Sequence, residues 1–143
     1  VTKAMIISNN LKMYVQKLRS SNLRPTKQRL KICQFLFDKK KTFHFTVETL
    51  NKKINKNRAA KVSLATIYNT VEAFTNAGYL KEILTSKNKS YYDTNIKSHH
   101  HFYDEGSKEL TDIHYSQIKL SKVPIPPKGK KIKNLEVVIR IQK

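Results

Sequence analysis

Residues 61–80 read KVSLATIYNTVEAFTNAGYL, a stretch with the pattern of a capped amphipathic helix. Its apolar residues recur at spacings of three and four, which aligns them on one helix face. They are Leu64, Ile67, Val71 and Phe74. Ser63 stands where an N-cap belongs and Gly78 where a left-handed C-terminal stop belongs. The opposite face carries small and hydrogen-bonding side chains, so it is slim enough to enter the DNA major groove.

The charge of the chain indicates what this face binds. The 143 residues carry a formal net charge of +19. Self-repulsion of this size indicates a polyanionic partner, such as nucleic acid or an anionic membrane surface. Residues 1–95 hold 19 Lys and Arg against 5 Asp and Glu, a balance of +14, whereas residues 96–143 hold 10 against 5, a balance of +5. We therefore expect nucleic-acid binding in the first part of the chain.

Three helices are expected before the quoted stretch. Ser8 can cap a first helix that ends near residues 20–22, and Thr26, after a proline, begins a second helix that runs to about Phe37. Thr46 opens a third helix, which is followed by a polar turn and the quoted helix. This order is that of a helix-turn-helix.

Strands are expected after that helix. Residues 79–84 and 90–94 can pair around the basic turn 85–89, which is suited to phosphate contact. Helices followed by such a hairpin predict a winged helix-turn-helix domain over residues 1–95. In residues 96–143 apolar positions alternate with polar ones, most clearly over residues 135–141, which predicts a small sheet. Because so short a segment can scarcely close a core alone, we expect it to pair with a second copy.

Consecutive histidines at His99, His100 and His101 are the main candidate site. Neutral imidazole nitrogens bind transition metals and haem iron. In a strand alternate residues face the same side, so His99 and His101 could share one ion while His100 points away. Surface histidines without a function are the open alternative. Four acidic residues nearby could supply oxygen ligands, but local charge balance explains most of them: Asp104, Glu105, Glu109 and Asp112.

The cysteine content and the hydropathy of the sequence indicate the cellular compartment of the protein. Cys33 is the only cysteine and lies in a wide apolar band, so we expect it in the core, with no intrachain disulfide and no Cys-bound structural zinc. Apolar runs of about 18 residues and a signal-peptide pattern are absent from the sequence. A soluble, cytoplasmic protein with no membrane partner is expected.

Six segments resemble a known family in their order and spacing. They are RPTKQRLKI, FHFTVETL, VSLATIYNTVEAFTNAGYL, SYYDTN, HHHFY and ELTDI. From Leu23 to Ile141 the chain resembles the ferric uptake regulator superfamily, and specifically its iron response regulator branch. The resemblance implies an α+β protein: a homodimeric transcription regulator with an N-terminal winged helix-turn-helix and a small C-terminal α/β dimerisation and ligand-sensing domain.

The resemblance also implies which residues contact DNA. Tyr68 and Asn69 would face the bases, Ser63 and Thr66 would lie close to the DNA backbone, and Arg24 would reach toward the minor groove. To these we add basic and hydroxyl residues of the second helix and of the hairpin turn. They are Thr26, Arg29, Lys87 and Lys89.

The regulatory ligand is the second implication. Relatives hold an ion with residues that match His44, His99 and His101, while the middle position is His100 here and the hairpin turn offers no matching carboxylate. The iron response regulator branch is thought to read iron through haem. We therefore expect haem at these histidines ahead of a divalent ion such as Fe, Mn or Zn, in a repressor of iron and haem metabolism.

A sequence-indifferent nucleic-acid-binding protein and an enzyme are the two other classes of function to consider. A sequence-indifferent nucleic-acid-binding protein, architectural or ribosome-associated, would also need the high positive charge, and it remains the alternative. An enzyme is not expected, because the histidines lack an H-E-x-x-H arrangement and the three glycines form no phosphate loop.

Overall fold

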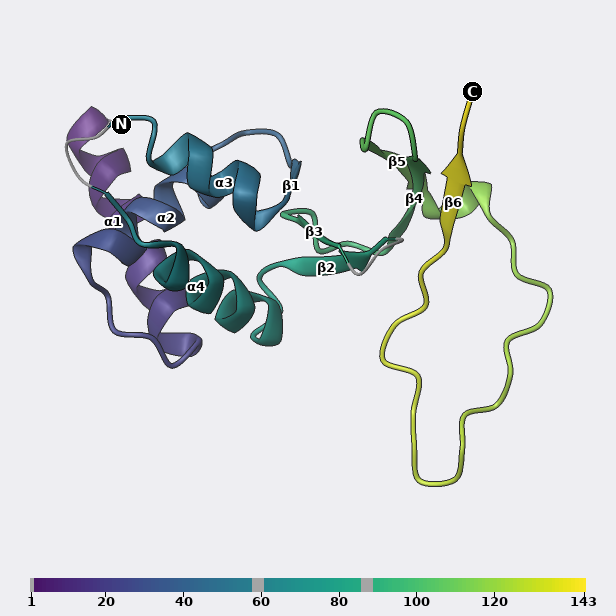
Figure 1. Cartoon of the computed structure of the whole chain (residues 1–143). Helices are drawn as coiled ribbons and strands as arrows, with labels where there is room; N and C mark the ends of the chain where they lie inside the picture. Colours follow the sequence, from purple (N-terminus) through teal and green to yellow (C-terminus); the bar gives the residue numbers. More distant parts are fainter. Residues whose placement is uncertain (1, 58–60, 86–88) are drawn as a thin grey trace. The chain divides into compact units, whose positions relative to one another are not determined.

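The computed structural model describes residues 2–57, 61–85 and 89–143. The chain divides into two compact units, Val1–Ile96 and Lys97–Lys143, and each is treated by itself (Figure 1). Together they give the expected α+β class, with helices in the first unit and a small sheet in the second. Among the described residues, no helix is both long and apolar enough to cross a membrane.

Four helices form most of the first unit, and each follows a hydroxyl residue that caps it. They are α1 (Lys3–Ser20), α2 (Lys27–Phe37), α3 (Val47–Ile54) and α4 (Leu64–Asn76). The side chains of the N-cap residues accept hydrogen bonds from first-turn amides: Thr2, Thr26, Thr46 and Ser63. The expected start of α1 at Ser8 is wrong, because Thr2 caps the helix and the chain is helical from Lys3 onward.

A three-stranded sheet completes the first unit. Its strands are β1 (His44–Phe45), β2 (Lys81–Leu84) and β3 (Ser90–Asp93), in the order β1-β3-β2 with antiparallel pairing throughout. The hairpin of β2 and β3 is the expected wing, and the Thr85 amide donates to the Lys89 carbonyl at 3.2 Å where its turn closes. Lys87 lies outside the described residues.

The core of the first unit lies between the helices. Ile67, Val71 and Phe74 of α4 are fully buried, as their spacing predicts, and Cys33 of α2 is buried beside them. Leu64 differs from the expectation, since 46% of it is exposed. It is the first residue of α4. Gly78 ends the helix segment with a φ of +87°, the left-handed conformation that glycine adopts without strain.

A side chain bridges the turn between α3 and α4. The Asn55 amide group donates to the Val62 carbonyl at 2.9 Å, and the Val62 amide donates to the Asn55 side-chain oxygen at 2.7 Å. Val62 is buried, so its backbone groups need these partners. This bridge sets where α4 begins relative to α3.

The second unit is a sheet of three strands, with a short connection between the first two and a long one before the third. Its strands are β4 (His99–Asp104), β5 (Leu110–His114) and β6 (Val138–Ile141), in the order β5-β4-β6. β4 pairs antiparallel with β5 and parallel with β6. A short 3-10 helix, η2 (Tyr115–Gln117), follows β5, and residues 118–137 have neither helix nor strand before β6.

Replacement of Asn55 by alanine tests the bridge between α3 and α4. The variant leaves the buried N–H and C=O of Val62 without partners, so we expect the free energy of unfolding to fall by about 1 to 3 kcal/mol. Urea unfolding followed by circular dichroism measures this. The control is Asn76→Ala at the exposed end of α4, which should change stability by no more than about 0.5 kcal/mol. Equal values for the two variants would contradict the proposed role of the bridge.

Candidate functional site

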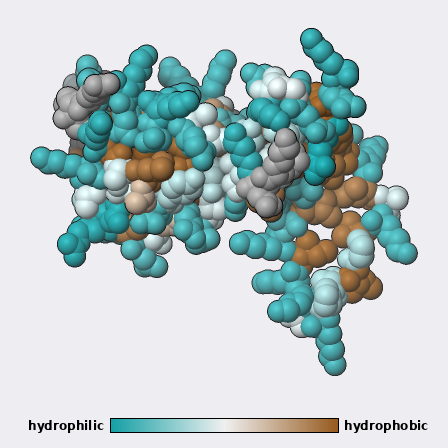
Figure 2. Space-filling model, viewed as in Figure 1, coloured by the Kyte–Doolittle hydropathy of each residue, from teal (hydrophilic) through white to brown (hydrophobic). Residues whose placement is uncertain are grey.

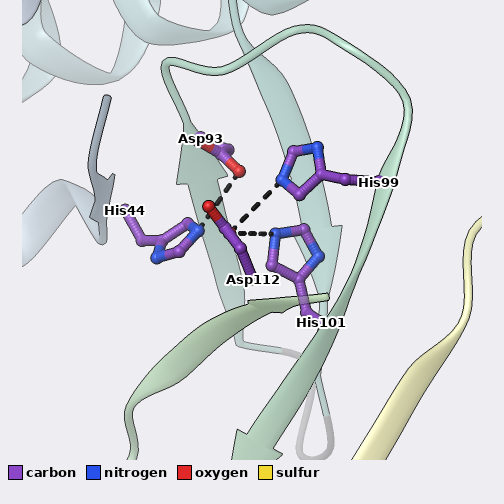
Figure 3. Close-up of side chains that lie close together, drawn as sticks. All are labelled: His44, Asp93, His99, His101 and Asp112. Atoms are coloured by element: carbon purple, nitrogen blue, oxygen red, sulfur yellow. Dashed lines mark ion pairs between the residues drawn. The ribbon is translucent and has the colours of Figure 1, made fainter. Parts of the chain in front are cut away.

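The register of β4 on β5 places two histidines and an aspartate on one face of the second sheet. His101 lies directly opposite Asp112, and His99 lies one pair further along the same face. Residues opposite or diagonal to one another on one sheet face are within side-chain reach. The Oδ1 atom of Asp112 is accordingly 3.3 Å from His101 Nε2 and 3.4 Å from His99 Nε2 (Figure 3).

Each of these imidazoles is oriented through its other nitrogen. His99 Nδ1 lies 2.6 Å from the Lys97 carbonyl oxygen, and His101 Nδ1 lies 3.0 Å from Glu136 Oε1, just before β6. A carbonyl and a carboxylate can only accept, so the proton of each neutral ring is on Nδ1. The Nε2 lone pairs of His99 and His101 therefore both point at an oxygen that also carries lone pairs.

That arrangement is electrostatically unfavourable unless a positive charge lies between the three atoms. Protonating both rings would place two cations with ring centroids only 4.4 Å apart in a protein that already carries +19. One divalent metal ion instead supplies its positive charge at a single centre that all three atoms can face. Two ligand atoms that are each about 2.1 Å from one ion lie about 3.0 to 3.4 Å apart, which matches both N···O distances. A donor set of two imidazoles and one carboxylate fits a divalent transition metal.

The carboxylate of Glu136 orients the His101 ring. Metal-binding histidines commonly donate their second N–H to a carboxylate or carbonyl, which fixes the ring and raises its basicity. Both histidines have such a partner, and this agrees with a metal site better than with two unrelated surface residues.

A second His–Asp pair lies in the first unit. β1 and β3 place His44 directly opposite Asp93, and His44 Nε2 is 3.2 Å from Asp93 Oδ2 (Figure 3). The other oxygen of Asp93 accepts a hydrogen bond from the Asn95 amide at 2.8 Å, which holds the carboxylate in place. This pair also offers one imidazole nitrogen and one carboxylate oxygen to a cation.

The candidate DNA-binding residues of α4 lie where their spacing predicts. Tyr68 is 44% exposed and Asn69 is also exposed, next to the buried Ile67 and Thr70. Ser63 caps α4 through the Thr66 amide, and the hydroxyls of Ser63 and Thr66 lie 2.7 Å apart.

The Tyr68 ring is held by a contact from α3. Its hydroxyl donates to Glu48 Oε1 at 3.1 Å. This hydrogen bond raises the pKa of Tyr68, so the hydroxyl stays protonated as a donor. The pKa of Glu48 is lowered, chiefly by its own backbone N–H at the start of α3. Glu48 thus remains charged and keeps Tyr68 oriented on the outer face.

The start of α2 adds a polar surface beside the outer face of α4. Thr26, Arg29 and Thr66 line a shallow depression of about 400 Å³ together with Lys27 and Gln28. The Arg29 guanidinium donates to the Arg24 carbonyl at 3.0 Å, which ties the two candidate arginine positions together. Free amides at the start of a helix and nearby cations are groups that bind phosphate oxygens.

The sequence of the chain is similar to those of a known protein family. The family model of the ferric uptake regulator family matches residues 20–140. The chain belongs to the ferric uptake regulator family. It is 29% identical over 112 residues to the peroxide-responsive repressor PerR of Staphylococcus epidermidis, a match that covers 78% of this chain and 73% of the relative. The finer expectation of the iron response regulator branch is not shown by these matches.

Solved structures of the family show the same fold. The ferric uptake regulator of Pseudomonas aeruginosa with manganese has a TM-score of 0.68 at 22% identity, over 91% of this chain and 97% of that one. The Helicobacter pylori ferric uptake regulator has a TM-score of 0.65 at 13% identity, over 95% and 90% of the two chains. Membership of a family of regulators also confirms the expectation that the chain is not an enzyme.

The structure changes the set of ligand candidates in this family member. His100 is not part of the group, because it lies on the other face of β4 and its Nδ1 accepts from the Val137 amide at 2.9 Å. Asp112, for which the sequence indicates mainly charge balance, faces both His99 and His101. Asp93 was missed, although it stands in the SYYDTN segment that carried the resemblance.

Replacement of the two carboxylates tests the metal site. Asp112→Asn removes the shared anionic ligand, so we expect the tight binding of Mn²⁺ or Zn²⁺ to be lost. Glu136→Gln keeps a hydrogen-bond acceptor but loses its charge, so we expect metal affinity to weaken by about 10- to 100-fold. Competition with a metal-binding dye measures both constants. The control Glu109→Gln, a carboxylate outside the group, should match the wild type, and unchanged binding in Asp112→Asn would remove the site.

Proposed function

We propose that the chain is a metal-responsive transcriptional repressor that binds DNA as a homodimer in the cytoplasm. The observation that carries the metal response is the convergence of two imidazole lone pairs on one carboxylate oxygen in the second unit. Family membership supports the regulatory role, and the name of the staphylococcal relatives, peroxide-responsive repressor, supports repression.

DNA binding is supported by the first unit. Its recognition helix is α4, which presents Tyr68 and Asn69, with Ser63 and Thr66 at its start. We assign four basic residues and one hydroxyl residue to phosphate contacts: Arg24, Thr26, Arg29, Lys87 and Lys89. The balance of +14 over residues 1–95 supplies the electrostatic attraction that DNA binding requires.

Dimer formation is supported by the edge of the second sheet. β6 is an edge strand, and its Ile139 and Ile141 are 38% and 39% exposed, close to Leu135 at 38%. An exposed apolar edge is a ready site for pairing with another chain. A two-fold dimer would present two copies of α4, so we expect a partly palindromic operator.

A divalent ion fits the histidines better than haem. His99 and His101 lie side by side on one sheet face and share one carboxylate, whereas two axial ligands of a haem iron approach from opposite faces of the ring. One haem could therefore use only one of the two. We rank Mn²⁺, Fe²⁺ or Zn²⁺ first and keep haem, with an iron response regulator role, as the alternative.

The coupling between metal and DNA would arise from ligands in both units. We propose, as the family resemblance implies, that His44 also binds the ion held by His99, His101 and Asp112. An ion that binds this way links the sensing unit to the DNA-binding unit and restricts their relative motion. Such coupling requires that the ion bind the DNA-competent arrangement more tightly than others.

A metal-dependent binding assay tests the proposal. A duplex is first selected from a random pool with Mn²⁺ present, and its Kd is then measured with Mn²⁺, Fe²⁺, Zn²⁺, haemin or a chelator. We expect chelation to weaken binding by about 5- to 150-fold and Asp112→Asn to bind alike in all ion conditions. Haemin that weakens binding in the absence of divalent ions would favour the haem alternative. Equal Kd values under every condition would contradict the proposed sensor function.

Two surface substitutions distinguish recognition of the DNA sequence from sequence-independent attraction to DNA. Tyr68→Ala should lower the ratio of specific to mixed-sequence affinity, which is about 10³ or more for ordinary specific binders. Lys89→Gln should weaken binding to both duplexes alike and reduce the salt slope by up to about 0.9. Titrations at several salt concentrations measure both effects. A wild-type ratio near one would instead support the sequence-indifferent architectural protein.

A further inference from the structure

The connection between η2 and β6 holds the net charge of the second unit. Residues 118–137, the lysine loop, contain six lysines and one acidic residue, Glu136, whose carboxylate faces His101. The lysines are Lys119, Lys122, Lys128, Lys130, Lys131 and Lys133. The rest of residues 97–143 has four basic and four acidic residues, which cancel. The whole +5 of this unit therefore lies on one loop.

The lysine loop has a defined, extended shape. It runs away from the sheet β5-β4-β6 and returns to it, as the yellow-green to yellow trace of Figure 1 shows. Three prolines, Pro124, Pro126 and Pro127, restrict φ and oppose a helix in its first arm. At its tip the Lys130 amide donates to the Pro127 carbonyl at 2.9 Å, and Gly129 has a φ of +78°, as a type II turn requires.

The ammonium groups of this loop are available to a partner. All six lysines are exposed, and in the part of the chain that the structure describes none of them has an ion-pair partner. Figure 2 shows hydrophilic side chains that project from this region beside apolar ones. Solubility of a small domain needs a net charge of only about 2 to 8, which residues 1–95 already exceed. A loop longer than about 15 residues without regular structure is usually functional or disordered, and here its tip is an ordered turn.

We propose that the lysine loop binds the phosphate backbone of the DNA, on segments that flank the site read by α4. This inference rests on the proposed DNA-binding function and adds to it a second contact surface, on the unit that carries the sensor histidines. Lysine suits this role, because its ammonium is a point charge that pairs with phosphates without reading bases. The loop should therefore add affinity and salt dependence, but no sequence preference.

The dimensions of the loop and its composition favour duplex DNA over other polyanions. About ten residues separate either end from the tip, so an extended arm spans up to about 33 Å, longer than the diameter of the DNA double helix. The loop contains no aromatic residue on which unpaired bases could stack, which disfavours single-stranded nucleic acid. Val123 and Ile125, which is 93% exposed, make an anionic lipid surface the main competitor.

Salt-dependent titration of the full chain tests the inference. The variant Lys128→Gln, Lys130→Gln, Lys131→Gln removes three charges at the tip. We expect the slope of log affinity against log salt to fall in magnitude by up to about 2.7 on a 40-base-pair duplex, with the specific-to-mixed affinity ratio unchanged. At 0.1 M salt the affinity should drop at least about tenfold. The matched control Lys108→Gln, Arg140→Gln, Lys143→Gln removes equal charge from the same unit and should change the slope by less than one contact, about 0.9.

A site-specific crosslink gives direct evidence of contact. Burial raises the pKa of Cys33 to about 12, and the residue has no exposed surface, so it does not compete for thiol reagents. Lys130→Cys can therefore be labelled alone with a photoactivatable azide in the otherwise unchanged chain. We expect crosslinks to DNA outside the segment protected by α4, and none above background from a labelled Lys108→Cys control.

The outcomes separate this inference from the function on which it rests. A wild-type protein that binds no duplex would refute DNA binding itself. If the wild type binds but the tip variant equals its control and Lys130→Cys gives no crosslink, the loop inference alone is overturned. Loss of binding to phosphatidylserine vesicles in the tip variant, with an unchanged DNA slope, would assign the loop to a membrane surface and equally overturn it. Circular dichroism confirms that each variant is folded.

Discussion

The site depends on the register of β4 against β5. Because side chains alternate between the two faces of a strand, a slip of one residue would turn His99 and His101 to the other face and pair His101 with Thr111 or Ile113 instead of Asp112. The parallel pairing of β4 with β6 then sets Glu136 behind His101. Strands β4, β5 and β6 therefore bring His99, His101 and Asp112 to one point, with Glu136 behind His101. No single segment of the sequence holds this information.

Helices and their caps were predictable because their determinants are local. Thr26, Thr46 and Ser63 each act within three residues, and the period of the apolar positions in α4 defines its buried face. The candidate metal ligands, by contrast, are brought together by strand pairing and not by local sequence. His44 lies opposite Asp93, 49 positions away in the sequence, and Asp112 faces His101 only when β5 pairs with β4 in one register. An acidic residue beside many lysines reads as charge balance until its cross-strand neighbour is known. The resemblance to the family found His44, His99 and His101, but not the carboxylates.

The distribution of donors between the units bears on why such a site would act as a sensor. The second unit alone supplies two imidazoles and one carboxylate, which leaves a coordination sphere of four to six ligands incomplete. Structural metal sites, by contrast, are usually closed by ligands of one compact unit. In the arrangement that we propose, His44 supplies a further donor from the unit that carries α4. The free energy of completing the sphere is then available only in arrangements that bring both units to the ion, which is the differential affinity that a metal-dependent regulator needs.

In the proposed complex, the residues that recognise bases are different from the charged residues that attract the protein to DNA. The helix α4, which we propose as the recognition helix, contains no lysine or arginine, and its single charged residue is Glu72. Glu48 lies beside it and keeps its charge while it orients Tyr68. A helix of this kind gains little from non-specific DNA, because neutral side chains at the groove bind well only where the bases complement them. The attraction must then come from elsewhere: from the start of α2, from the wing, and from the lysine loop, which carries the net charge of the sensing unit. Since Coulomb attraction is insensitive to sequence and falls steeply with salt, residence on DNA and choice of site are controlled by different residues.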